Sequence, residues 1–200
     1  MEHIMTQLDL QVESSLLPLF FPLFEKGVVL SAEIGCSVKD FLCGQLGISE
    51  DYLDQRIQTL FLDFHPVDDV NTAVVRDGST LALSAAMPGL VGATMRKGGR
   101  YAAFRQDISQ CREDDDVCKA AGRVTLKMFN MVASELGDRF LEAGVEIDAE
   151  DLKWIADRNP KALPGGIVQA RLDGRETALN DDLFSGLAGR RFWFTVRVSE

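Results

Sequence analysis

The sequence lacks any long apolar run. Its richest apolar stretch, residues 16–24, falls short of the roughly 18 consecutive apolar residues that a membrane-spanning helix needs, and Pro18 and Pro22 interrupt it. The start of the chain carries Glu2 and Asp9 instead of the basic, apolar and small-residue pattern of a signal peptide. We therefore expect no membrane partner and a cytoplasmic location.

An excess of positive charge is also missing. The formal net charge of the 200 residues is −10, which repels nucleic-acid phosphates and anionic lipid, so nucleic acid is not an expected partner. Apolar residues make up 46% of the chain, which is ample for at least one buried core. The length lies between that of one large domain and that of two small ones.

Histidine is scarce, with two residues in the chain. His3 lies close to the start, which leaves His65 as the histidine expected in a folded region, within the sequence Asp-Phe-His-Pro-Val-Asp-Asp. A histidine beside carboxylates can act as a metal ligand or general base. The same residues also describe a solvated turn after a strand, and we favour the turn because it accounts for every polar residue there.

Several motifs of enzymes are absent. The chain has no G-x-S-x-G for a serine nucleophile, no G-x-x-x-x-G-K-[ST] for a P-loop and no G-x-G-x-x-G for a dinucleotide fold. The basic segment Arg96, Lys97, Gly98, Gly99 and Arg100 is nevertheless a candidate anion-binding site, because backbone amides and basic side chains can surround a phosphate or carboxylate. An exposed linker between domains is the alternative interpretation.

The periodicity of apolar residues predicts an order of elements. In the first half we expect two short helices, capped by Ser37 and Ser49, and strands over residues 8–13, 28–34, 59–64, 72–75 and 81–85. In the second half we expect a long helix from about 117 toward Gly137, a shorter one to Gly144 and a third from Asp148 to Asn159-Pro160. Strands over 167–172, 176–179 and 192–198 complete the chain.

Two segments resemble the β-grasp (ubiquitin-like) sulfur-carrier family of the MoaD and ThiS type. Residues 37–42 (Ser-Val-Lys-Asp-Phe-Leu) match the start of the family's helix, and residues 76–83 (Arg-Asp-Gly-Ser-Thr-Leu-Ala-Leu) match its late strand, with Pro88-Gly89-Leu90-Val91-Gly92 at the position of its tail. The resemblance implies an α+β fold class, with an N-terminal β-grasp domain over residues 1–104. A smaller helix-then-strand domain then covers residues 105–200, with helices over about 114–158 and strands over about 166–198.

The family's carrier chemistry needs a C-terminal Gly-Gly, whereas this chain ends Val196-Arg197-Val198-Ser199-Glu200. The Gly-Gly near the expected place is Gly98-Gly99. The resemblance therefore allows a carrier only if the chain is cleaved after Gly99. A flexible turn at Gly98-Gly99 is the simpler interpretation.

The four cysteines form two pairs in the spacing C-x6-C, Cys36 with Cys43 and Cys111 with Cys118. Thiolates are the ligands of zinc and iron–sulfur centres, yet seven residues span about 10.5 Å in a helix, which is too far for one disulfide or one zinc. We expect free thiols in a reducing compartment, without metal or cofactor. A thiol redox enzyme that combines these cysteines with the Arg96–Arg100 segment remains a second alternative.

The apolar run over residues 16–24 is either core or a surface for a partner or a second copy. Its candidate surface residues are Leu19, Phe20, Phe21 and Phe24. Because no catalytic constellation is assembled in the sequence, the leading hypothesis is a noncatalytic protein-interaction or accessory module.

Overall fold

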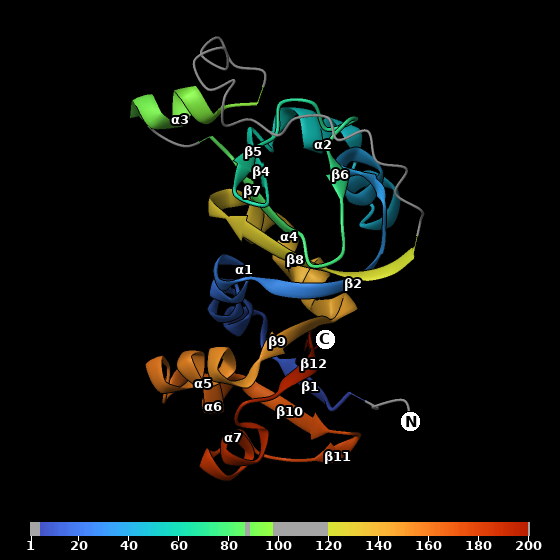
Figure 1. Cartoon of the computed structure of the whole chain (residues 1–200). Coiled ribbons are helices and arrows are strands. Elements are labelled where there is room, and N and C mark those ends of the chain that lie inside the picture. Colours follow the sequence, from blue (N-terminus) through green and yellow to red (C-terminus); the bar gives the residue numbers. More distant parts are fainter. Residues whose placement is uncertain (1–4, 87–88, 98–119, 200) are drawn as a thin grey trace. The chain divides into compact units, whose positions relative to one another are not determined.

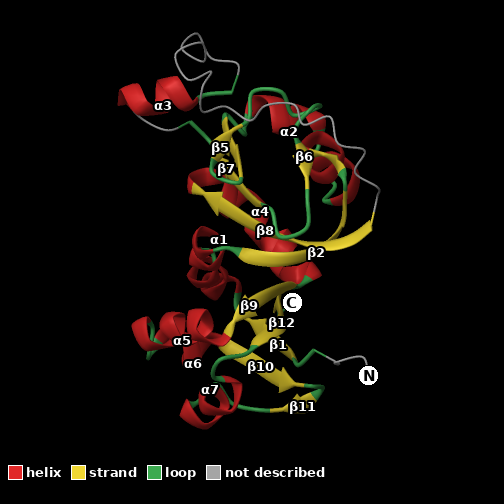
Figure 2. Ribbon diagram, in the orientation of Figure 1, coloured by secondary structure: helices red, strands yellow, loops and turns green. Residues whose placement is uncertain are grey.

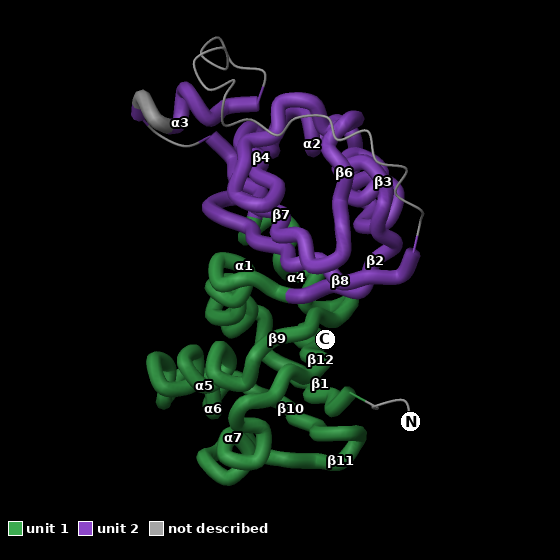
Figure 3. The backbone as a smooth tube through the Cα atoms, in the orientation of Figure 1, with its two compact units in different colours: residues 1–28, 133–200 green, residues 29–132 purple. Residues whose placement is uncertain are grey.

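The computed structural model describes residues 5–86, 89–97 and 120–199 and has the α+β architecture that the sequence predicts (Figure 1). The chain divides into two compact units (Figure 3). Unit 1 joins residues 1–28 to residues 133–200, and unit 2 comprises residues 29–132. Within the described ranges, no helix is both long and apolar enough to cross a membrane.

Unit 1 is built from both ends of the chain. Its elements are β1 (Gln7–Val12), the 3-10 helix η1 (Ser14–Phe20), α1 (Pro22–Lys26), most of α4 (Asn130–Ala143), β9 (Val145–Asp148), α5 (Ala149–Arg158), α6 (Ala162–Gly166), β10 (Ile167–Leu172), β11 (Arg175–Glu176), α7 (Asp181–Leu187) and β12 (Arg191–Val198). Its strands lie in the order β11-β10-β1-β12-β9. The first and last strands, β1 and β12, pair in parallel, and β10 and β9 flank them in antiparallel pairs.

The core of unit 1 lies on one face of this sheet. Every second residue of β1 and of most of β12 is buried, and Figure 2 shows α5, α6 and α7 on one side of the strands. The ring of Phe20 lies 5.7 Å from that of Phe194, and the ring of Phe24 lies 6.2 Å from that of Phe140, both between ring centroids. The tilted ring pairs join η1 and α1 to β12 and α4.

Helix α5 shows how local signals place an element. Asp148 is its N-cap, with extended backbone. The helix ends at Arg158, and its C-cap Asn159 lies directly before Pro160. Lys26 forms an ion pair with Asp151 at 2.7 Å and lies 4.4 Å from the ring centroid of Trp154, which holds α1 against α5.

Unit 2 holds the middle of the chain. Its elements are β2 (Val28–Ile34), β3 (Cys36–Ser37), the π-helix η2 (Asp40–Gln45), α2 (Glu50–Gln55), β4 (Thr59–Leu62), β5 (His65–Pro66), β6 (Val74–Val75), β7 (Thr80–Ser84), α3 (Gly89–Met95) and β8 (Ala120–Phe129). The strands of its main sheet lie in the order β2-β8-β7-β4-β5, and β3 pairs separately with β6. Strands β7 and β8 are parallel, whereas β4 is antiparallel to both β7 and β5.

The sheet of unit 2 has an apolar face and a mixed face. Leucines, a valine and a methionine at alternate positions of β4, β7 and β8 are buried, and they form its core with residues of η2. The intervening side chains of these strands, among them Thr59, Phe61, Ala82 and Ser84, point to the other face. Cross-strand register aligns Thr59 with Ser84, and Ser84 with Phe129.

The long helix expected from about residue 117 toward Gly137 is wrong. Residues 120–129 form strand β8, and α4 begins only at Asn130, whose φ of 54° marks the change from strand to helix. Val124, Leu126 and Met128 are each 0% exposed, so burial follows a period of two. The helical interpretation had no place for Leu126, and pairing with β7 selects the strand.

The compact units differ from the sequence-based division into residues 1–104 and 105–200. Strand β1 pairs with β10 and β12, so the first 28 residues lie in one unit with the last part of the chain. The expected boundary itself lies outside the described residues, so that division stays a prediction.

Candidate functional site

The outer edge of β10 in unit 1 is only partly covered by a neighbouring strand. On its inner side, β10 pairs with β1, with a bulge between Gln11 and Val12 that leaves Val168 outside the register. On its outer side, β11 pairs with Arg171 and Leu172, and the backbone N–H of Thr177 donates to the carbonyl of Ala170 at 3.0 Å. In the described part of the chain, no strand pairs with this side of residues 167–169.

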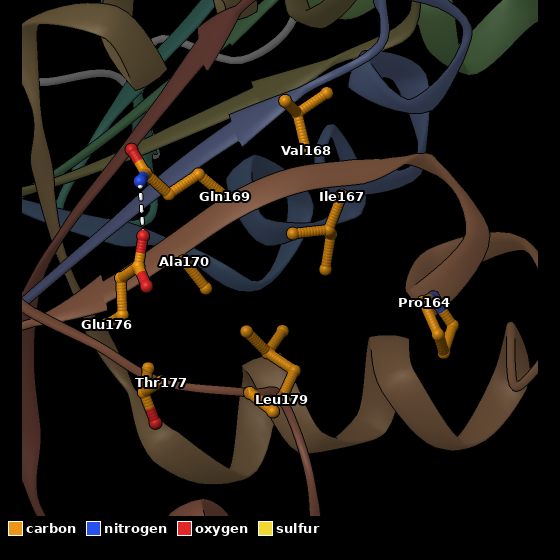
Figure 4. Close-up of a pocket in the computed structure, with 9 residues that line it drawn as sticks. Pro164, Ile167, Val168, Gln169, Ala170, Glu176, Thr177 and Leu179 are labelled. Carbon is orange, nitrogen blue, oxygen red and sulfur yellow. Dashed lines mark hydrogen bonds between the residues drawn. The ribbon is translucent and has the colours of Figure 1, made fainter.

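A cleft of about 370 Å³ lies beside this edge (Figure 4), and we call it the β10 cleft. It is lined by Pro164, Ile167, Val168, Gln169, Ala170, Glu176, Thr177, Ala178 and Leu179. Figure 4 shows the side chains of Ile167 and Leu179 pointing toward one another across it, while that of Val168 points away. The amide of Gln169 donates to the carboxylate of Glu176 at 2.8 Å. The cleft therefore combines an apolar floor with an accessible strand edge.

A second cavity lies on the mixed face of the unit 2 sheet, and we call it the Thr59 cavity. Its volume is about 270 Å³, and it is lined by Thr59, Phe61, Ala82, Ser84, Phe129 and Asn130. The residues come from β4, β7, β8 and the first position of α4, which their register places side by side. Two aromatic rings and an alanine thus accompany two hydroxyls and an amide.

The hydroxyl of Thr59 is the unusual group in this cavity. Thr59 is 1% exposed, and its Oγ1 has no hydrogen-bond partner among the residues that the structure describes. A buried hydroxyl without a partner costs about 1–3 kcal/mol. The neighbouring Ser84 hydroxyl accepts a hydrogen bond from the Asn130 amide at 3.1 Å.

A further cavity of about 170 Å³ adjoins the Thr59 cavity, because both are lined by Thr59. Its other lining residues are Gln58, Ala86, Gly89, Gly92, Ala93 and Arg96. Helix α3 thus contributes glycine and alanine to the wall of this cavity. Just after the helix, the Lys97 N–H donates to the Gln58 carbonyl at 2.7 Å.

The basic segment expected to bind an anion is described only in part. Arg96 lines the adjoining cavity. The Lys97 ammonium instead donates to the carbonyl of Leu53 at 3.0 Å and lies 3.6 Å from the Asp54 carboxylate, so its charge is used within unit 2. Gly98, Gly99 and Arg100 lie outside the described residues.

Of the four candidate thiols, two belong to the described residues. Cys36 is buried, donates to the Glu33 carbonyl at 3.3 Å and accepts from the Gln45 amide at 3.2 Å. Burial raises the pKa of Cys43 above its ordinary value, and the Glu50 carboxylate raises it further. The environment of Cys43 therefore does not favour a reactive thiolate. Cys111 and Cys118 lie outside the described part of the chain.

The apolar run of residues 16–24 contributes largely to the core of unit 1. Phe20 and Phe24 are both 0% exposed, while Leu19 and Phe21 are half-buried. Two of the four candidate surface residues are therefore core residues, because their rings pack against Phe194 and Phe140.

The segment around His65 forms a tight hairpin turn. Asp63 and Phe64 have φ of 49° and 68° between β4 and β5, and the Asp63 carboxylate accepts from the Ser79 hydroxyl at 2.9 Å and the Thr80 N–H at 2.7 Å. Nδ1 of His65 lies 2.8 Å from the Asp63 carbonyl. The contacts of Asp63 and His65 therefore support the turn. Within the described residues, no group of three or more His, Cys, Asp or Glu side chains is placed to hold a metal ion.

Sequence reasoning did not identify the β10 cleft or the Thr59 cavity. A signal for the second was present, because Thr59 is the polar residue of the otherwise apolar strand Thr-Leu-Phe-Leu. No comparable signal in the sequence marks the outer edge of β10. This edge is accessible because β11 pairs only with Arg171 and Leu172.

Comparisons of the chain with protein-family models, with curated proteins and with solved structures found no match.

Proposed function

We propose that this protein is a noncatalytic interaction module that binds an extended segment of a partner protein along the outer edge of β10. The observation that carries the proposal is the strand edge over residues 167–169, which lacks a described strand neighbour and lies beside an apolar cleft. An added strand supplies main-chain hydrogen bonds, and the cleft supplies selectivity for side chains.

Exposure of apolar side chains at this edge supports the proposal. Val168 is 57% exposed, and natural proteins usually protect strand edges with charge, proline or a covering element. Three edge residues extend over about 10 Å, which suits a short peptide strand. We expect the bound segment to place one apolar side chain between Ile167 and Leu179.

For unit 2 we propose the β-grasp (ubiquitin-like) arrangement. Two features support it. The Ser37 hydroxyl accepts from the Asp40 N–H at 3.0 Å at the start of the helix that follows β2 and β3, and residues 80–84 form the late strand β7. The tail segment of the resemblance differs, because residues 89–95 form helix α3. The alternatives of a processed carrier and of a thiol enzyme both depend on residues within 98–119, outside the described part.

Selection of peptides from a display library on the full chain tests the proposed function. The affinity of a selected peptide is then measured for the wild type, for Leu179→Lys and for Phe64→Lys. Leu179→Lys places a charge in the cleft and should weaken binding at least about tenfold. Phe64→Lys is the matched control, because Phe64 is exposed in unit 2 and does not line the β10 cleft, and it should change affinity less than about twofold.

The proposal fails if no peptide is selected, or if Leu179→Lys binds selected peptides as well as the wild type does. Light scattering on the same samples separates a heterologous partner from a second copy. A dimer that Leu179→Lys dissociates would make the chain itself the occupant of the edge and would contradict a peptide partner.

A further inference from the structure

Phe64 lies at the tip of the hairpin that joins β4 to β5. Among the large apolar side chains of the described residues it is the most exposed, at 85%. Its φ is 68°, and that of the preceding Asp63 is 49°. Two consecutive positive φ values define a turn that usually holds Asn-Gly or Asp-Gly, and a bulky side chain at the second position strains the backbone. Phe64 therefore combines strain with exposure, neither of which stabilises a single chain.

The Thr59 cavity, in the same unit, presents mainly apolar surface. Its lining residues Phe61, Ala82 and Phe129 are half-buried, whereas Thr59 and Ser84 are only 1% and 6% exposed. The accessible part of the lining is therefore dominated by two aromatic rings and a methyl group. A benzene molecule fits an apolar cavity of about 150 Å³, so the cavity of about 270 Å³ has room for a phenylalanine ring.

Phe64 does not fill the cavity of its own chain, because it is largely exposed and does not line that cavity. It follows Phe61 by three residues, so the hairpin tip lies roughly 10 Å along the chain from the cavity. A two-fold axis between the tip and the cavity would place the Phe64 ring of each copy at the cavity of the other. Such an interface uses the same patch twice and closes at two copies.

We propose that two copies of this chain form a reciprocal dimer, in which Phe64 of each copy enters the Thr59 cavity of the other. A second copy is the occupant that the chain itself indicates, since both the projecting ring and the apolar cavity belong to one unit of it. The ring leaves water and packs against Phe61 and Phe129, which is the usual form of an aromatic hot spot. The contact shares no residue with the β10 cleft.

Sedimentation velocity on the full chain, from about 1 to about 500 µM and at about 0.15 M salt to screen the repulsion between acidic chains, tests this proposal. We expect a dimer with a Kd below about 100 µM, as for a small interface with two aromatic anchors. Phe64→Gly should weaken the dimer at least about 100-fold, because each dimer loses both anchors. Val168→Ala, which shortens an exposed apolar side chain of unit 1, is the matched control and should change the Kd less than about twofold.

Denaturant titration of the monomers separates a binding role of Phe64 from a structural one. Phe64→Gly places glycine at a φ of 68°, after an aspartate that also has a positive φ. At concentrations where both proteins are monomeric, this variant should unfold at a denaturant concentration no lower than the wild type does, because the strain is relieved. A lower midpoint would mean that Phe64 supports its own chain and would contradict the proposal.

Mixing two variants tests whether the contact is reciprocal. Ala82→Trp fills the cavity but keeps the Phe64 ring, whereas Phe64→Gly keeps the cavity and lacks the ring, so neither should dimerise alone. Together they can form one of the two contacts, with an expected Kd of about 1 mM or below. Isotope-labelled Phe64→Gly should therefore show saturable NMR shifts at the amides of Phe61, Ala82 and Phe129 when unlabelled Ala82→Trp is added. With the labels exchanged, the shifts should lie at the β4–β5 hairpin.

The proposal is overturned if the wild type stays monomeric up to about 500 µM, if Phe64→Gly dimerises as well as the wild type does, or if the mixed variants show no shifts at the cavity. A dimer that Leu179→Lys dissociates and Phe64→Gly does not would also overturn it, and would place the second copy at the β10 edge. A dimer that is lost in Phe64→Gly and kept in Leu179→Lys supports it and leaves the peptide partner of the β10 cleft to its own test.

Discussion

Gly144 is a residue at which backbone conformation and core packing impose the same requirement. Its φ is 97°, and a Cβ built at this position would collide with the indole of Trp193. Gly144→Ala should therefore lower the free energy of unfolding by about 2–4 kcal/mol, from the positive φ together with the steric conflict.

Denaturant titration measures this effect, with Gly174→Ala as the control. Gly174 also has a positive φ of 76°, but a Cβ there would meet no atom within 4 Å. Gly174→Ala should therefore lower the free energy of unfolding only by the cost of the positive φ, about 1–2 kcal/mol. Equal losses at the two positions would mean that Trp193 does not lie against Gly144.

Cys43 carries a prediction about pH. Burial, together with the Glu50 carboxylate, raises its pKa above the ordinary value of 9.0, so the folded chain holds the thiol proton to higher pH than the unfolded chain does. The corresponding contribution to stability is present below the unfolded pKa and is lost as pH rises through the folded pKa. Alkylation by iodoacetamide, resolved by peptide mass spectrometry from about pH 7 to about pH 11, should show an inflection above 9.0 for Cys43. An inflection below that value would contradict the buried environment.

At the residue scale, local chemistry was predictable and tertiary environment was not. The cap at Ser37 forms with Asp40 as expected, because both partners lie within one helical turn. The Thr59 hydroxyl lacks a hydrogen-bond partner among the described residues, although Ser84 and Asn130 lie beside it in the fold. The Asn130 amide donates to the Ser84 hydroxyl and not to Thr59, and the sequence does not show this choice.

Strand β8 is the element whose type the sequence pattern misidentified, and Leu126 tests it. In the strand, Leu126 faces the core and is 0% exposed, whereas in the expected helix it would lie off the apolar face. Leu126→Ala should therefore lower the free energy of unfolding by about 2–5 kcal/mol. Lys127→Ala, on the mixed face, should change it by less than about 0.5 kcal/mol. Similar small effects in both variants would favour the helix.

Elements with strong local boundaries were predicted better. Helix α5 starts after Asp148 and ends before Pro160, and β12 buries Phe192, Phe194 and Val196 at alternate positions, as its apolar pattern predicts. Strand β8 lacks such signals, because its apolar residues satisfy helical spacing as well as alternation. Its pairing with β7, 40 or more residues away, decides between them.

At the scale of the whole molecule, unit 1 consists of two segments that unit 2 separates in the sequence. The strands that belong to unit 1 all come from residues 1–28 and 133–200. Joining these two segments directly with a short Gly-Ser linker should therefore give a cooperatively folded protein, as judged by thermal unfolding and dispersed NMR spectra. A fragment of residues 1–104 is the comparison, because it holds β1 without β10 and β12. Cooperative folding of that fragment, together with an unfolded joined protein, would favour the contiguous division.

The fold class was within reach of the sequence, and the strand partners of β1 were not. Alternating and helical patterns gave an α+β chain, since each pattern is local. The partners of β1 come from residues 167–172 and 191–198, and no pattern in β1 identifies them. The β10 cleft was equally out of reach of the sequence. It lies beside residues 167–169 of β10, which pair with β1 on one side and have no described strand partner on the other.

Hydrogen exchange on the full chain, with and without a selected peptide, tests the proposed function most directly. If an extended segment adds to β10, the backbone amides of residues 167–169 and of the cleft residues 178–179 should become protected on binding, while the exchange of unit 2 stays unchanged. Protection confined to other strands, or none at all with a peptide that binds, would contradict strand addition at β10.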